Sequence, residues 1–187
     1  MRKLIMWNIM TLDGYFEGEK KWDLPFHELV WGPELEQRSI EQLDQADYLL
    51  FGRVTWEGMA AYWIGAEGEV ARRMNSVPKL VASNTLTSAD WPHSTIISGD
   101  IGAEIRRLKS QEGKDIYVFG SADLSDTLIR QDLFDEYRIG IAPVVIGKGQ
   151  PLFQPGTEIN KLQLISTWSL ENGGVVLTYR PGNPVQS

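Results

Sequence analysis

Cysteine is absent from the 187 residues of this sequence. Disulfide bridges, thiolate nucleophiles and cysteine-ligated zinc or iron–sulfur sites are therefore excluded. Histidine is scarce as well: only His27 and His93 occur, and their separation does not match metal-ligand spacing. A metal site would depend on carboxylates alone, and we predict none. Since the lack of cysteine is typical of a reducing compartment, we expect a cytoplasmic protein.

Basic residues are in the minority, because 18 Lys and Arg residues face 25 Asp and Glu residues, for a net charge of -7. This charge opposes broad contact with nucleic acid, so a phosphate-bearing ligand would have to be held locally. Long apolar runs are also missing. Asn8 and Asp13 interrupt the N-terminal run far below the length of a signal sequence or membrane span. We predict neither a nucleic-acid nor a membrane partner.

What the sequence does contain is an alternation of short apolar runs, bounded by turn residues, with stretches of helical periodicity. This pattern is typical of an α/β domain with a largely parallel sheet. We predict one domain over residues 1–180 and a disordered tail over 181–187. The predicted strands are residues 3–10, 48–51, 79–82, 95–97, 116–119, 136–145, 162–167 and 175–179, and the predicted helices are 34–43, 55–59, 67–75, 101–110 and 121–130.

Three predicted strands end in residues suited to binding an anion at the carboxyl edge of the sheet. After 48–51, Gly52 permits close approach of a ligand, Arg53 supplies charge, and Thr55 is expected to cap the next helix. The other two strand ends supply hydroxyls and small residues. Ordinary strand-to-helix turns are the alternative at each position. The segments are Gly52 to Thr55, Ser83 to Thr85, and Phe119 to Leu124.

The first predicted strand leaves the sheet at Asp13, followed by Gly14. The carboxylate of Asp13 could orient a substrate or relay a proton. The alternative is an Asp-Gly turn in a surface loop.

These segments occur in the order and approximate spacing found in one superfamily. From about residue 3 to residue 180 the sequence resembles the dihydrofolate reductase-like superfamily. The branch is that of the reductase domain of riboflavin-biosynthesis deaminase-reductases and its small stand-alone relatives. The matching segments are residues 11–14, 52–57, 83–86, 118–121, 133–137 and 142–153, the last beginning Ala142-Pro143-Val144-Val145.

The resemblance implies a three-layer α/β/α fold, with a twisted, mostly parallel sheet and an antiparallel C-terminal edge. It also implies NADPH across the carboxyl ends of the strands, with Arg53 and Ser83 at the 2′-phosphate and the strand end at Asn8 to Met10 facing the nicotinamide. Relatives suggest a homodimer, for which residues 139–145 could supply an edge. The cofactor-binding residues implied are Asn8, Met10, Gly52, Arg53, Val54, Thr55, Ser83, Asn84, Thr85, Phe119, Gly120, Ser121, Ala122 and Leu124.

Two departures from the family pattern bear on the ligand. Gly120-Ser121 replaces a common pair of glycines. The helix carboxylate that binds pterin in true dihydrofolate reductases has no clear counterpart, since Glu28, Glu34 and Glu36 all compete for the place. We therefore do not expect folate as the substrate. Among the aromatic residues, Trp7 and Trp56 are interpreted as core, while Trp31 and Trp63 remain candidates for the substrate cleft.

The leading hypothesis is an NADPH-dependent reductase that delivers hydride to a small polar carbonyl or imine compound, with Asp13 as the catalytic candidate. One alternative is a catalytically inactive, nucleotide-binding, dimer-forming scaffold of the same fold. Another is a flavin or pterin binder that uses the aromatic cleft without NADPH.

Overall fold

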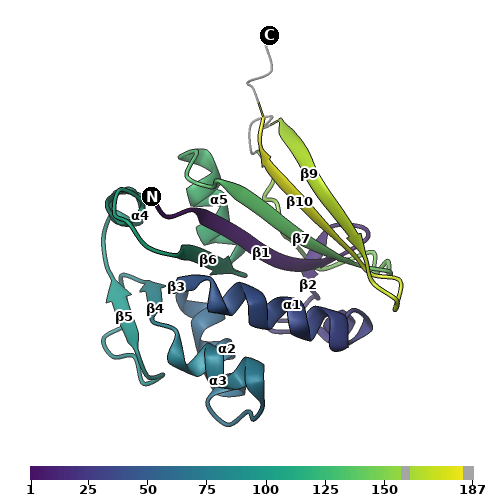
Figure 1. The fold of residues 1–187 in the computed structure, drawn as a ribbon, viewed down its shortest axis with the longest axis horizontal. Coiled ribbons are helices and arrows are strands. Elements are labelled where there is room, and N and C mark those ends of the chain that lie inside the picture. Colours follow the sequence, from purple (N-terminus) through teal and green to yellow (C-terminus); the bar gives the residue numbers. More distant parts are fainter. Residues whose placement is uncertain (157–160, 183–187) are drawn as a thin grey trace.

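A computed structural model describes residues 1–156 and 161–182 (Figure 1). Its main sheet has eight strands in the order β5-β4-β3-β6-β1-β7-β10-β9. From β5 to β7 neighbouring strands are parallel, while β10 is antiparallel to β7 and β9 is antiparallel to β10. The strands are β1 (Leu4–Thr11), β3 (Ala46–Gly52), β4 (Lys79–Ala82), β5 (Ser94–Ile97), β6 (Asp115–Phe119), β7 (Glu136–Ala142), β9 (Leu162–Ser169) and β10 (Val175–Pro181).

Helices cover both faces of this sheet. On one face, α1 (Pro33–Asp44), α2 (Arg53–Trp63) and α3 (Glu69–Ser76) contribute to one buried cluster. On the other, α4 (Ile101–Lys109) and α5 (Ala122–Arg130) contribute to a second cluster. The predicted three-layer α/β/α dihydrofolate reductase-like fold, with its antiparallel edge, is confirmed. No helix within the described residues is both long and apolar enough to cross a membrane.

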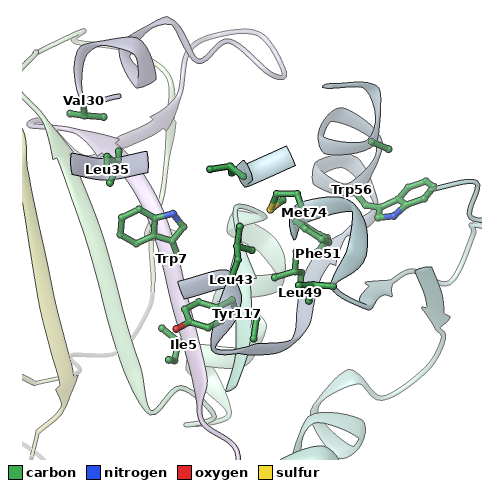
Figure 2. Packing of buried hydrophobic residues seen from close by; sticks show 14 of the residues in the cluster. Ile5, Trp7, Val30, Leu35, Leu43, Leu49, Phe51, Trp56, Met74 and Tyr117 are labelled. Carbon is green, nitrogen blue, oxygen red and sulfur yellow. The ribbon is translucent and has the colours of Figure 1, made fainter. Parts of the chain in front are cut away.

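The core on the α1 face is built around large side chains from β1, β3, β6 and α1. Figure 2 shows Trp7, Leu43, Phe51 and Met74 gathered there. Trp7 and Trp56 are both buried, as interpreted from the sequence. Along β1, Ile5 and Trp7 face this cluster, whereas Leu4 and Met6 face the cluster on the other side of the sheet. A slip of one residue in β1 would exchange the two faces.

A buried lysine secures the start of β4. Lys79 is fully buried, and its Nζ donates to the carbonyl oxygens of Asn75 at 2.7 Å and Pro92 at 3.1 Å. The same ammonium lies 4.5 Å from the ring centroid of Trp91. Burial lowers the pKa of Lys79 to about 8. The side chain therefore joins the start of β4 to the segments at Asn75 and Pro92. Burying its charge costs free energy, and that cost depends on pH because the ammonium can lose its proton.

The C-terminal strands differ from the sequence predictions in two respects. β7 ends at Ala142 rather than at 145, because Pro143 has no N–H to donate to a ladder. β7 also lies between β1 and β10, so the prediction that residues 139–145 supply a sheet edge is wrong. Within the described residues the outer strand on this side is β9, on which Leu164 and Ile165 are exposed.

Three short elements were not predicted. β2 (Tyr15–Glu17) and β8 (Gln150–Pro151) form a two-stranded antiparallel sheet, and a 3-10 helix spans Pro25–Leu29. Each is too short to produce a recognisable period. At the C-terminus, β10 includes Pro181, and Gly182 N donates to Lys161 O, so the first two residues of the predicted tail are hydrogen-bonded to the sheet edge or belong to it. Residues 183–187 of that tail lie outside the described residues.

Candidate functional site

A cleft of about 1270 Å³ lies at the carboxyl ends of β1, β3, β4 and β6. It extends from the first turns of α2 and α5 to the wall formed by α1 and α3. This is the edge at which open α/β sheets bind ligands. Eleven of the predicted cofactor-binding residues line it, namely Asn8, Gly52, Arg53, Val54, Thr55, Ser83, Phe119, Gly120, Ser121, Ala122 and Leu124.

The turns that end β3 and β6 interlock. A Cβ added at Gly52 would lie 2.1 Å from Ser121 Oγ, and one added at Gly120 would lie 2.8 Å from Thr55 Cγ2. The Thr55 and Ser121 hydroxyls are 3.3 Å apart and hydrogen-bonded. The first turns of α2 and α5 therefore stand side by side, with glycine where any larger residue would collide.

The start of α2 differs from the prediction that Thr55 caps it. The N-cap is Gly52, no side chain caps the helix, and Thr55 lies in its first turn with its hydroxyl bonded to Ser121. At α5 the N-cap is Ser121 itself, in the left-handed conformation with a φ of 61°, and it too makes no capping hydrogen bond. Both helix N-termini thus keep backbone N–H groups available to an anion.

Asn8 supplies a second polar feature of the cleft floor. Its Oδ1 accepts a hydrogen bond from Gly120 N at 2.8 Å, so this oxygen holds the left-handed Gly120 in place. Because the partner is a donor, the orientation of the amide is fixed and Nδ2 points away. Asn8 is 5% exposed, and its Nδ2 is buried without a hydrogen-bond partner. A buried unpaired donor that lines a cleft indicates a ligand with an acceptor.

Arg53 and Ser83 lie near the mouth of the cleft. Arg53 is exposed and forms an ion pair with Glu57, with Nη1 at 2.8 Å from Oε1. Ser83 Oγ accepts hydrogen bonds from Thr85 N and Leu86 N, which leaves its own proton free to donate. Both side chains can therefore turn toward an anion at this end of the cleft.

Four of the predicted residues lie outside the cleft lining. Met10 faces the core on the α5 side. Asn84 Oδ1 accepts a hydrogen bond from Gly99 N at 2.8 Å, and Thr85 closes a turn on Ser83. These interactions shape the loop after β4 and leave Asn84 and Thr85 away from the cleft wall.

Asp13 is the fourth residue outside the lining. Its carboxylate accepts hydrogen bonds from Thr11 Oγ1 at 2.6 Å and Gly147 N at 2.8 Å, and also from Ile146 N. The Thr11 hydroxyl and then the Gly147 and Ile146 amides lower the pKa of Asp13. The carboxylate joins the turn after β1 to the loop after β7. Its catalytic assignment stays a prediction.

Comparison with known proteins shows the family. The model of the RibD C-terminal domain matches residues 2–176. This chain belongs to the RibD C-terminal domain family. It is 31% identical over 186 residues to the uncharacterized protein YyaP of Bacillus subtilis (strain 168). The alignment covers 95% of this chain and 94% of that relative.

Solved structures support the same fold. A putative riboflavin biosynthesis protein from Shewanella sp. PV-4 superposes with a TM-score of 0.80 at 21% identity, covering 98% of this chain and 100% of that one. A pyrimidine reductase-like protein from Corynebacterium diphtheriae gives 0.69 at 13% identity, with coverage of 98% and 93%. Dihydrofolate reductase from Enterococcus faecalis, complexed with NADP(H), gives 0.65 at 14% identity, with 97% of both chains covered.

The sequence left three carboxylates as candidates for the cleft, and the structure places one of them in its lining and two outside it. Glu28 lines the cleft and is exposed. Glu34 instead accepts a hydrogen bond from Glu171 N at 2.8 Å, and Glu36 is exposed outside the lining. The cleft of this family member therefore presents no buried carboxylate from α1 among the described residues.

Two further cleft residues were missed by sequence reasoning, His27 and Gln42. His27 lies on the 3-10 helix, and burial lowers its pKa to about 4. Its Nε2 is buried without a partner. Gln42, on α1, is 3% exposed and lines the cleft. Neither had a signal in the sequence, because a lone histidine or a glutamine on an amphipathic helix usually belongs to the surface.

Aromatic side chains cover the outer part of the cleft. Trp31 and Trp63, the two candidates from the sequence, both line it, and Trp22 lines it too. A Cβ added at Gly58 on α2 would lie 2.5 Å from the Trp22 ring, so the loop after β2 rests directly on α2. Flat apolar ligands suit such a surface.

Proposed function

We propose that this protein is an NADPH-dependent reductase that transfers hydride to a small polar carbonyl or imine compound. The observation that carries the proposal is the pair of helix N-termini held side by side by Gly52, Gly120 and the Thr55–Ser121 hydrogen bond. Two such N-termini provide backbone donors for both halves of a pyrophosphate. Membership of the RibD C-terminal domain family and the NADP(H) complex of a structural neighbour support the same ligand.

The residues at the cleft fit the remaining parts of this cofactor. Asn8 Nδ2 would donate to the carbonyl oxygen of the nicotinamide carboxamide, which would satisfy its buried N–H groups. Arg53 and Ser83 would bind the 2′-phosphate that distinguishes NADPH from NADH. The cofactor supplies the hydride, and the protein orients donor and acceptor and excludes water. Asp13 is proposed to assist from the loop after β1, either by positioning the substrate or by relaying a proton.

Location and assembly remain proposals as well. We propose a cytoplasmic homodimer. Support for the dimer comes from the outer strand β9, where Leu164 and Ile165 are exposed in a position to pack against a second copy. Analytical ultracentrifugation of the full chain tests this, and a monomer at all concentrations would refute it.

Calorimetric titration of the purified protein with NADPH and with NADH tests the cofactor. We expect saturable binding of NADPH and weaker binding of NADH. Absence of NADPH binding, or equal affinity for the two, would overturn the proposal. Oxidation of NADPH in the presence of candidate carbonyl compounds then separates a reductase from a binding scaffold without turnover.

A further inference from the structure

Gln42 presents an amide whose orientation is fixed by its partner. Its Oε1 accepts a hydrogen bond from Arg138 Nη1 at 2.9 Å. A guanidinium has donors and no acceptor, so the atom that faces Arg138 must be the carboxamide oxygen. Nε2 therefore points elsewhere, and it donates to no acceptor within residues 1–156 and 161–182. Gln42 is 3% exposed and lines the cleft, so its Nε2 can donate to an acceptor on a ligand bound there.

Arg138 cannot easily release this oxygen. Its Nε donates to Glu136 Oε1 at 2.5 Å, and its Nη1 is also 3.1 Å from Tyr117 Oη. The guanidinium lies 5.5 Å from the centroid of the Tyr117 ring, within the range of a cation–π interaction. Turning the amide over would place N–H groups against a charged donor, which is unfavourable. Arg138 thus acts as a positioning residue for Gln42.

The walls beside Gln42 are apolar and partly aromatic. Trp7, Leu43 and Met74 are buried there, and Trp63 and Met59 pack against the same cluster. We call this part of the cleft, between β1, α1, α2 and α3, the α1-side compartment. Rings and thioethers of this kind favour a flat apolar ligand over a sugar or a flexible polar chain.

Charge is concentrated away from this compartment. The cleft is lined by four carboxylates and two cations, Glu17, Glu19, Glu28, Asp123, Lys21 and Arg53, each exposed or half-buried. The excess of carboxylates opposes an anionic substrate, and Arg53 is already assigned to the cofactor. His27 on the inner wall is neutral at pH 7, because burial holds its pKa at about 4. A charged substrate group would therefore find no partner deep in the cleft.

We propose that the α1-side compartment binds an uncharged, flat heteroaromatic carbonyl compound whose oxygen accepts a hydrogen bond from Gln42 Nε2. The inference rests on the proposed function, because it takes NADPH to occupy the α2 and α5 side of the cleft and leaves this compartment to the substrate. It excludes two classes of substrate. These are phosphorylated pyrimidines, which need cations, and pterins, whose amino group and ring N–H need a buried carboxylate.

Three quinoline probes test the inference by titration calorimetry on the NADPH-saturated protein. They are 2-quinolone, which is neutral with an acceptor carbonyl, 2-aminoquinoline, which carries an amino donor in place of the carbonyl, and 2-oxoquinoline-4-carboxylate, which adds a negative charge. All are titrated at a pH above the ring pKa of 2-aminoquinoline, so that this probe is uncharged. Coumarin is a second neutral acceptor, in case the shape of one ring disfavours binding. We expect saturable binding of 2-quinolone or coumarin, and at least about 3-fold weaker binding of 2-aminoquinoline, the size of one hydrogen bond. The carboxylate probe should also bind more weakly, because the excess of carboxylates in the cleft lining opposes its charge.

Substitutions at Gln42 make the test specific. Gln42→Leu should weaken the binding of 2-quinolone and coumarin about 3- to 10-fold. Gln42→Glu keeps a partner for Arg138, so it should fold normally, and its second carboxylate oxygen should reverse the preference toward 2-aminoquinoline. The proposal is overturned if neither neutral probe binds, if the carboxylate probe binds best, or if Gln42→Glu leaves the preference unchanged. Failure of NADPH itself to bind is measured separately in the same titrations and counts against the proposed function.

Discussion

The hydroxyl of Thr55 donates to that of Ser121 across 66 residues of sequence, at 3.3 Å, and so joins the first turn of α2 to the first turn of α5. Neither helix uses these side chains as a cap. The contact brings two sets of unpaired backbone N–H groups to one place at the carboxyl edge of the sheet, which is why the cleft is suited to a diphosphate.

Gly120→Val should impair NADPH binding more than folding. The Cβ would lie 2.8 Å from Thr55 Cγ2, and the branched side chain would push apart the two helix starts. The left-handed φ of 60° adds strain of about 1–2 kcal/mol. We expect a loss of at least about 10-fold in NADPH affinity by calorimetry, the effect of 1.4 kcal/mol of lost binding.

Gly99→Val is the matched control for this change. Gly99 also has a left-handed φ, of 88°, but a Cβ there meets nothing within 4 Å and the residue lies outside the cleft. It should lose stability through the same kind of backbone strain and keep NADPH binding. Unchanged affinity in a folded Gly120→Val variant would mean that the turn after β6 is only a turn.

Arg53→Ala should remove most of the preference for NADPH over NADH. A charge-assisted contact to the 2′-phosphate is worth about 1.5–3 kcal/mol, and we expect the lower end because Arg53 is 42% exposed, hence roughly a 10-fold effect. Glu57→Gln removes the ion-pair partner of Arg53 and leaves the guanidinium in place, so it should retain the preference. If both variants lost it equally, the Arg53–Glu57 pair rather than the phosphate contact would be responsible.

Local signals in the sequence predicted the α/β class and the strand ends of the site, whereas the dihydrofolate reductase-like fold was implied by the family resemblance. Apolar runs followed by Gly52 or Gly120 mark β3, β6 and the turns that follow them. Gln42 could not be predicted, because its burial depends on Arg138, which is 96 residues away in the sequence. For the same reason β2 and β8 were missed, since strands of three and two residues exist only through their pairing.

Lys79 should make stability depend on pH in the alkaline range. Its pKa is about 8 in the folded protein against 10.5 for the free side chain. Between these values the unfolded chain binds more protons, so this group raises the free energy of unfolding as pH increases, by at most about 1.4 kcal/mol per pH unit. Below pH 8 both states are protonated and the contribution is constant.

Urea unfolding from pH 7.5 to 10.5 on the natural protein and on Lys79→Met measures this effect by difference, which cancels the other lysines and the tyrosines. The curve for the natural protein should rise relative to that of Lys79→Met as pH increases. Parallel curves would show that Lys79 keeps an ordinary pKa despite its burial beside Trp91.

Asp13→Asn separates catalysis from loop anchoring. The amide keeps the size of the carboxyl group and one acceptor oxygen, while it removes the charge to which Thr11 Oγ1, Ile146 N and Gly147 N donate. NADPH affinity should stay near normal, because Asp13 lies outside the cleft lining. The free energy of unfolding at pH 7 should fall, because hydrogen bonds to a charged group are weakened.

The pH dependence provides an independent check. Because the folded pKa of Asp13 is lowered, its stabilisation is present above the ordinary pKa of 3.8 and is lost as pH falls through the folded value. Asp13→Asn should abolish that acid-range component in urea unfolding. Once a substrate is known, a fall in turnover of about 100- to 10,000-fold would support acid–base catalysis by this carboxylate. Normal turnover with reduced stability would leave Asp13 as the anchor between the two loops.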